Sequence, residues 1–177
     1  MTRIWTDGCC LVNPGGAGGW AFVVEADGEV ISEEWGSEPE TTNNRMELMA
    51  VIEALPWAEG RRVRIVSDSK YVVDGATGWV HTWKAHGWKR PTRRGFRAVK
   101  NVELWKVLDG LLYPTPGGAH GDAIPVAKLE WVKGHDGAVF NERADLLAER
   151  AAANALPADP DPDPADEFVE RFGWSPG

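Results

Sequence analysis

The sequence lacks any run of about 18 apolar residues, which a membrane-spanning helix would need, so we expect no membrane association. A long apolar stretch with a small-residue cleavage site is also missing after Met1, and we expect no signal peptide. Cysteine is scarce, because Cys9 and Cys10 are the only two. Neighbours in a strand point to opposite faces, so this pair is unsuited to a disulfide, and two cysteines alone cannot form a zinc site. These absences favour a reducing compartment, and we expect a cytoplasmic protein.

Basic residues are also in deficit, with 19 Lys and Arg against 27 acids and a net charge of −8 at pH 7. An evenly acidic surface would argue against a nucleic-acid partner. The charge is uneven, however, because residues 79–106 contain eight Lys or Arg and one acid, Glu103, and so carry +7. This segment, the basic segment, also contains four of the ten tryptophans. The net charge therefore does not exclude a polyanionic substrate.

The pattern of apolar residues predicts one α/β domain over residues 1–156. An antiparallel meander with an Asp27-Gly28 turn comes first, and parallel strands follow through helical crossovers. The predicted strands are 2–7, 20–26, 29–35, 62–66 and 125–132, with loops over 13–19 and 113–125. The predicted helices are 44–59, 69–77, 79–87, 101–112 and one capped by Asn141 that ends near 156, with a basic loop between 87 and 101.

Residues 157–177 form a second unit, an acidic tail in which Pro and Asp alternate. Such a sequence cannot pack a core and is typical of an extended, solvated segment. The tail carries six acids and one base, Arg171, so it is able to compete with nucleic acid for the basic segment.

Four carboxylates stand at positions where they are expected to converge. Asp7 interrupts the first strand, and Asp68 ends the strand that we expect beside it, where ligands of open α/β sheets gather. Glu47 and Asp145 lie in the predicted first turns of two helices. Together these acids would offer the oxygen ligands that Mg²⁺ prefers.

Each acid also has a purely structural explanation. Glu47 follows Asn44 at the spacing of a capping box, and Asp68 is able to cap the next helix. Asp145 would suit a helix dipole, and Asp7 would suit the protection of a sheet edge. Taken singly, these explanations are favoured for every acid except Asp7. The surrounding motifs reverse that balance.

Five motifs in register carry the resemblance: Thr6-Asp7-Gly8, Asn43 to Leu48, Ser67 to Val72, Trp131 to His135 and Asn141 to Asp145. In this order they closely resemble ribonuclease H type 1, the bacterial ribonuclease HI family, over residues 2 to about 155. The resemblance implies a ribonuclease H-like fold, with a five-stranded mixed sheet of three antiparallel and then parallel strands, flanked by helices. It also implies a monomeric endonuclease that cuts the RNA strand of RNA–DNA hybrids, leaves 5′-phosphate and 3′-hydroxyl ends, and removes RNA primers and hybrids.

The same resemblance implies the site residues. Two Mg²⁺ ions, for which Mn²⁺ is a possible substitute, would bind Asp7, Glu47, Asp68 and Asp145, and His135 would assist proton transfer or product release. The implied contacts to the wide minor groove, where 2′-hydroxyls mark the RNA, are Cys10, Asn13, Asn43, Asn44 and Lys70. The implied contacts to the DNA strand are Thr42, Asn101, Trp79, Trp83, Lys84, Lys89, Arg93 and Arg94, with Arg90 and Arg97 adding attraction to the backbone.

Two departures from the family pattern bear on DNA binding. Glu40 stands where many relatives have an arginine, and Ala85 stands where a lysine is common. Two rival functions remain: another metal nuclease of the same fold, such as a junction resolvase or transposase core, and a hybrid-binding module without activity. The Asn43 to Leu48 motif and the basic segment oppose the first rival, and the intact set of acids with His135 opposes the second.

Overall fold

The computed structural model describes residues 1–114 and 125–155, so the acidic tail and most of the predicted 113–125 loop lie outside the described residues. The helices are α1 (Asn43–Ala58), α2 (Lys70–Asp74), the π-helical turn η1 (Gly75–Trp79), α3 (Val80–Ala85), α4 (Val102–Leu112) and α5 (Val139–Asn154). The strands are β1 (Thr2–Cys10), β2 (Gly18–Ala26), β3 (Glu29–Glu38), β4 (Val63–Ser67), β5 (Lys89–Thr92), β6 (Gly95–Ala98) and β7 (Lys128–Trp131). None of the described helices is long and apolar enough to cross a membrane.

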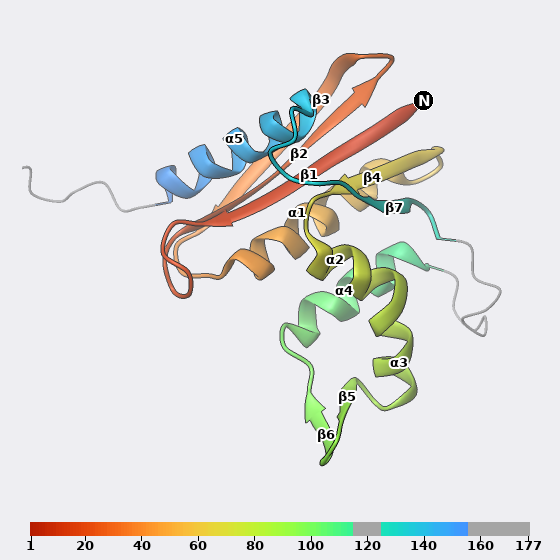
Figure 1. The fold of residues 1–177 in the computed structure, drawn as a ribbon. Coiled ribbons are helices and arrows are strands. Elements are labelled where there is room, and N and C mark those ends of the chain that lie inside the picture. The colour runs from red at the N-terminus through yellow and green to blue at the C-terminus, as the bar shows by residue number, and fades with distance from the viewer. Residues whose placement is uncertain (115–124, 156–177) are drawn as a thin grey trace, which may run out of the picture.

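The main sheet has the strand order β3-β2-β1-β4-β7, which confirms the predicted five-stranded mixed sheet. The first three strands pair antiparallel, and β4 and β7 continue the sheet in parallel (Figure 1). Thr6 of β1 lies opposite Ser67 of β4. Asp7, the next residue of β1, and Asp68, the residue directly after β4, are therefore neighbours at the carboxyl end of β4.

Helices cover both faces of this sheet, with α5 on one side and α1 with α4 on the other (Figure 1). Alternate residues of β1 face the two layers, because side chains in a strand alternate. Gly8 lies so close to α1 that a Cβ there would be 2.2 Å from the Glu47 nitrogen. Trp5, on the other face, lies with its ring 6.2 Å from that of Phe140 in α5. The core on the α1 side includes the fully buried Ile4, Ile65 and Trp105.

Several predicted boundaries were wrong. The second strand begins at Gly18, within the predicted 13–19 loop, and pairs there with Cys10. Gly19 is a glycine within a strand because the backbone of α5 packs where its Cβ would lie. The first and third strands extend to Cys10 and Glu38. The last strand is shorter than 125–132: Pro125 has no N–H, and the amide of Val126 donates to the Leu112 carbonyl instead of a strand.

Two further predictions need correction. The basic loop contains an antiparallel hairpin, β5–β6, in which Arg90 lies opposite Arg97. Residues 70–85 form an unbroken helical stretch of α2, η1 and α3, not two separate helices. The hairpin projects from the body of the protein below α3 (Figure 1). We call residues 89–98 the basic hairpin.

Candidate active site

Four acids lie together beside the carboxyl end of β4, and we call them the acidic cluster: Asp7, Glu47, Asp68 and Asp145. The pairing of β1 with β4 brings Asp7 next to Asp68. The absence of a side chain at Gly8 lets the first turns of α1 approach β1, which places Glu47 near them. Asp145 comes from the second turn of α5 and forms a side-chain hydrogen bond with Asp7. The structure therefore places the four acids together.

Two carboxyl groups of the cluster, those of Asp7 and Glu47, have strongly raised pKa values. Burial, and then the charges of Asp68 and Asp145, raise the pKa of Asp7 from 3.8 to about 9, so Asp7 holds a proton that it shares with Asp145 at neutral pH. Burial and the charge of Asp68 also raise the pKa of Glu47 to about 7, although the Ser69 hydroxyl donates a hydrogen bond to it. Perturbed carboxylates in one place are typical of functional sites.

The structure contradicts the capping, helix-dipole and sheet-edge explanations for the four acids. Thr42, not Asn44, caps α1, and its hydroxyl accepts from the Arg45 amide, which excludes a capping box with Glu47. Ser69, not Asp68, caps α2. Asp7 lies on the central strand and protects no edge. Asp145 was predicted in a first turn, but α5 begins at Val139 and places it one turn deeper.

A divalent cation fits the donor set of the acidic cluster. The four side chains offer only carboxylate oxygens, the ligands of hard cations, and a cation would replace the shared proton of Asp7. Within residues 1–114 and 125–155, no group of three or more His, Cys, Asp or Glu side chains is already arranged to hold a metal ion. Binding of a cation therefore requires the deprotonation of Asp7.

His135 lies at the rim of the cluster on an exposed loop. Its side chain is 80% exposed, and its Nδ1 is 3.8 Å from Oδ2 of Asp145. The loop is shaped by left-handed backbone at His135 and at Gly137. The loop therefore places the His135 ring beside Asp145 at the exposed side of the cluster.

Asn141 and Trp131 are contacts of the cluster that the sequence analysis did not assign. Asn141 was predicted to cap the last helix, but Ala138 occupies that position and the amide of Asn141 donates to Asp68 Oδ2 at 3.1 Å. The Trp131 indole donates to the Asp68 carbonyl at 2.9 Å. The resemblance motifs contain both residues, and that is the one signal that pointed to them.

The predicted minor-groove residues lie around the start of α1 and the end of β1. The Cys10 thiol contacts three carbonyl oxygens, among them that of Val12 at 3.2 Å, and Asn13 Oδ1 accepts from the Asn43 amide at 3.3 Å. Asn44 is exposed. Lys70 lies beside Asp68, with its Nζ 4.5 Å from the centre of the Trp131 ring. The Asn13–Asn43 hydrogen bond joins the loop after β1 to the start of α1, and Lys70 contacts the tryptophan that is bonded to Asp68.

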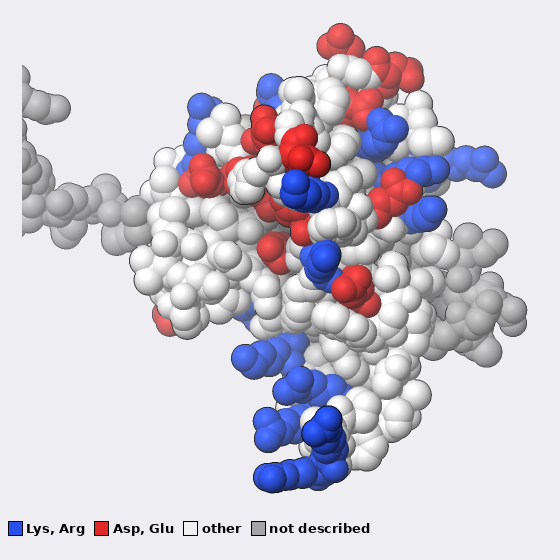
Figure 2. All heavy atoms as spheres, viewed as in Figure 1, with Lys and Arg blue, Asp and Glu red and all other residues white. Residues whose placement is uncertain are grey.

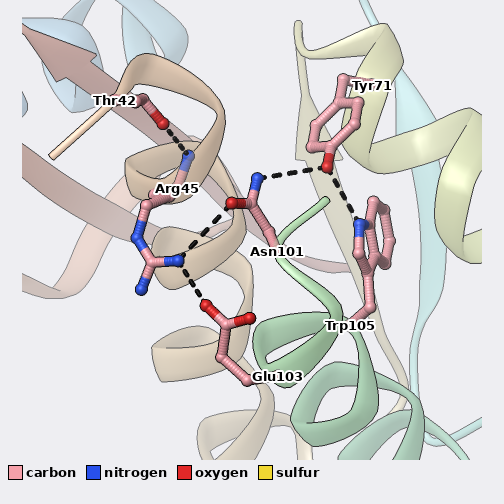
Figure 3. Close-up of polar contacts among 6 residues, drawn as sticks. All are labelled: Thr42, Arg45, Tyr71, Asn101, Glu103 and Trp105. Atoms are coloured by element: carbon pink, nitrogen blue, oxygen red, sulfur yellow. Dashed lines mark hydrogen bonds and ion pairs between the residues drawn. The ribbon is translucent and has the colours of Figure 1, made fainter. Parts of the chain in front are cut away.

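Thr42 and Asn101, predicted to grip a DNA phosphate, belong to one polar network (Figure 3). Thr42 accepts from the amide of Arg45, whose guanidinium donates to Asn101 Oδ1 at 3.5 Å and to Glu103. The Asn101 amide donates to the Tyr71 hydroxyl at 3.3 Å, and the Trp105 indole donates to the same oxygen at 3.0 Å. This chain of contacts joins α1, α4 and α2.

The predicted tryptophans differ in exposure. Trp79 is 41% exposed, whereas Trp83 is 8% exposed and packs in the core. Both still line a pocket of about 550 Å³ between α3 and the basic hairpin. The other lining residues are Tyr71, Thr82, Arg90, Pro91, Val99 and Lys100. The pocket thus combines aromatic surface with two cations.

Positive charge gathers on the basic hairpin (Figure 2). Lys89, Arg93 and Arg94 are exposed there, and the hairpin contains no acid. Lys84 is placed differently, since its Nζ forms an ion pair with Asp109 at 2.6 Å in a largely buried position between α3 and α4. The hairpin therefore offers its cations to a polyanion, whereas the partly buried Lys84 is paired with an acid of the protein itself.

Comparisons with known proteins agree on one family. The RNase H family model matches residues 1–153. Ribonuclease H of Rhodospirillum rubrum is 46% identical over 155 residues, which cover 86% of this chain and 83% of that protein. Ribonuclease HI of Neisseria meningitidis serogroup B is 46% identical over 151 residues, covering 85% and 94% of the two chains.

A solved structure agrees with these relatives. LC9-RNase H1, a type 1 RNase H with the type 2 active-site motif, superposes with a TM-score of 0.67 at 34% identity, covering 97% of this chain and 82% of that one. The chain therefore belongs to the ribonuclease H family of phosphodiester hydrolases, nucleases that cleave the RNA strand of RNA–DNA hybrids.

Proposed function

We propose that this protein is a cytoplasmic, monomeric endonuclease that removes RNA primers and hybrids by cutting the RNA strand with two Mg²⁺ ions. We propose that residues 1–156 are its catalytic domain and that it leaves 5′-phosphate and 3′-hydroxyl ends. The observation that carries this proposal is the acidic cluster, because four carboxylates from separate parts of the chain meet beside the carboxyl end of β4.

In this mechanism Asp7, Glu47, Asp68 and Asp145 would hold the two metal ions, either Mg²⁺ or Mn²⁺. Bound there, the ions would supply activation of the attacking water and stabilisation of the leaving 3′ oxygen. Asp7 must first release the proton that it shares with Asp145. His135, exposed on its loop and near Asp145, would pass a proton from solvent to the leaving 3′ oxygen or help the product to depart.

The remaining site residues distinguish the two strands of the substrate. Cys10, Asn13, Asn43, Asn44 and Lys70 line the approach to the acidic cluster and contact the groove that displays 2′-hydroxyls. Thr42 and Asn101 hold a phosphate of the DNA strand, and Trp79 and Trp83 pack against a sugar without a 2′-hydroxyl. Lys89, Arg93 and Arg94 attract the backbone without reading its sequence.

The proposal is tested by separating cleavage from binding. Asp68→Asn should abolish cleavage of a hybrid with Mg²⁺ and retain hybrid binding, because the groove contacts remain. Asp74→Asn, an exposed acid on α2, is the matched control and should cleave normally. Wild-type products should accept a 3′ extension by a polymerase, which requires a 3′-hydroxyl. Normal cleavage by Asp68→Asn, or products that cannot be extended, would contradict the proposal.

A further inference from the structure

Asp68 accepts two hydrogen bonds from side chains of other elements, and Gly134 packs against its carboxylate. Asn141 Nδ2 donates to its Oδ2 at 3.1 Å, and the Trp131 indole donates to its main-chain carbonyl at 2.9 Å. Gly134 faces the same Oδ2, which a Cβ at that position would approach to 2.6 Å. In the described part of the chain, no hydrogen bond is made to Asp68 Oδ1.

Asn141 is an unusual residue for its position. Its side chain is 2% exposed on a turn of α5 that packs against the sheet, and its Oδ1 finds no hydrogen-bond partner among the described residues. A buried acceptor without a partner costs about 1–3 kcal/mol, which an apolar residue there would avoid. The amide therefore costs stability that an apolar residue would not, and its single described side-chain hydrogen bond is the one to Asp68.

We propose that Asn141 is a positioning residue that holds the Asp68 carboxylate with Oδ1 free for a divalent cation. An amide donor suits this task, because it fixes one oxygen and adds no charge to a cluster that already contains four acids. Trp131 fixes the main chain of Asp68, and Gly134 leaves the space that the carboxylate occupies. This inference rests on the proposed function, in which Asp68 binds the metal.

The role of Asn141 is tested by Mg²⁺ binding in the absence of nucleic acid. Asn141→Ala should weaken Mg²⁺ binding, followed by isothermal titration, by about 10- to 100-fold, the usual effect of losing a partner that orients a metal ligand. Its kcat at low Mg²⁺ should fall in proportion, while KM for the hybrid stays unchanged. The urea midpoint of the metal-free protein should change little, because the unpartnered Oδ1 is removed with the donor.

Two further variants separate positioning from packing. Asn141→Leu keeps the volume without the donor and should reproduce the loss, whereas Asn154→Ala, at the exposed end of α5, should bind Mg²⁺ as the wild type does. Unchanged Mg²⁺ affinity in folded Asn141→Ala or Asn141→Leu would overturn the inference.

If neither variant folds, the side-chain amide of Asn141 is observed by NMR in the wild type and in Asp68→Ala. The inference requires a signal that shifts on loss of the Asp68 carboxylate, and an unshifted signal would refute it. A wild type that binds Mg²⁺ but does not cut hybrids would refute the proposed function and leave the role of Asn141 standing.

Discussion

The shared proton of Asp7 predicts how the metal-free protein responds to pH. The pKa of Asp7 is raised from 3.8 to about 9, so the folded state holds a proton that the unfolded chain has already lost above pH 4. Stability from this group is therefore complete at low pH and falls as the pH rises toward 9. Asp7→Asn imitates the protonated form and should remove this dependence.

The size of the effect follows from the shift. Between pH 5 and pH 8 the folded state stays protonated, and each pH unit costs about 1.4 kcal/mol, or about 4 kcal/mol in all. Because the side chain is only partly buried, solvent screens the interaction, and we expect about half, or about 2 kcal/mol. In a domain of this size that corresponds to a difference of about 4–8 °C in Tm.

The assay is urea unfolding with EDTA at pH 5 and pH 8, followed by circular dichroism. The wild type should lose about 2 kcal/mol more than Asp7→Asn between the two pH values, which cancels contributions from other groups such as Glu47. Asp74→Asn, an exposed acid, should behave as the wild type does. Equal pH dependence in wild type and Asp7→Asn would refute the shared proton.

Three further predictions follow from the same geometry. Mg²⁺ binding at pH 7 should release about one proton from Asp7 and a fraction from Glu47, measured by titration in buffers of different ionisation enthalpy; no release would contradict the raised pKa values. Arg93→Glu with Arg94→Glu should weaken hybrid binding and flatten the slope of log affinity against log salt concentration by about 0.9 per lost phosphate contact. The control, Arg61→Glu with Arg62→Glu, should leave that slope unchanged, because these two residues line a second pocket that shares no residue with the one beside the basic hairpin. Lys84→Met should lower the free energy of unfolding by about 2 kcal/mol, because Asp109 is left buried and unpaired, and adding Asp109→Leu should restore it; an unaffected urea midpoint would contradict the ion pair.

The sequence predicted features that depend on local patterns. Alternating apolar residues indicated the strands, and the expected pairing of the first and fourth strands was enough to predict that Asp7 and Asp68 are neighbours. What failed depended on contacts across the fold. The strands of the basic hairpin are almost wholly exposed and have no apolar alternation to reveal them.

The capping role predicted for Asn141 was wrong for the same reason. Asn141 has the residue type of a helix cap, but the bond to Asp68 uses its amide inside the helix. The contact of Lys84 with the DNA strand stays a prediction, and its ion pair with Asp109 of α4 is a contact that the sequence did not predict. A residue's type limits what it is able to do, and only the packing of distant elements selects among those roles.

Strand selectivity tests the central claim most directly. Wild-type protein with Mg²⁺ is incubated with three duplexes of one sequence: an RNA–DNA hybrid, double-stranded RNA and double-stranded DNA, each with both strands labelled. The account predicts that only the RNA strand of the hybrid is cut efficiently. Equal cutting of double-stranded RNA, or cutting of the DNA strand, would contradict it.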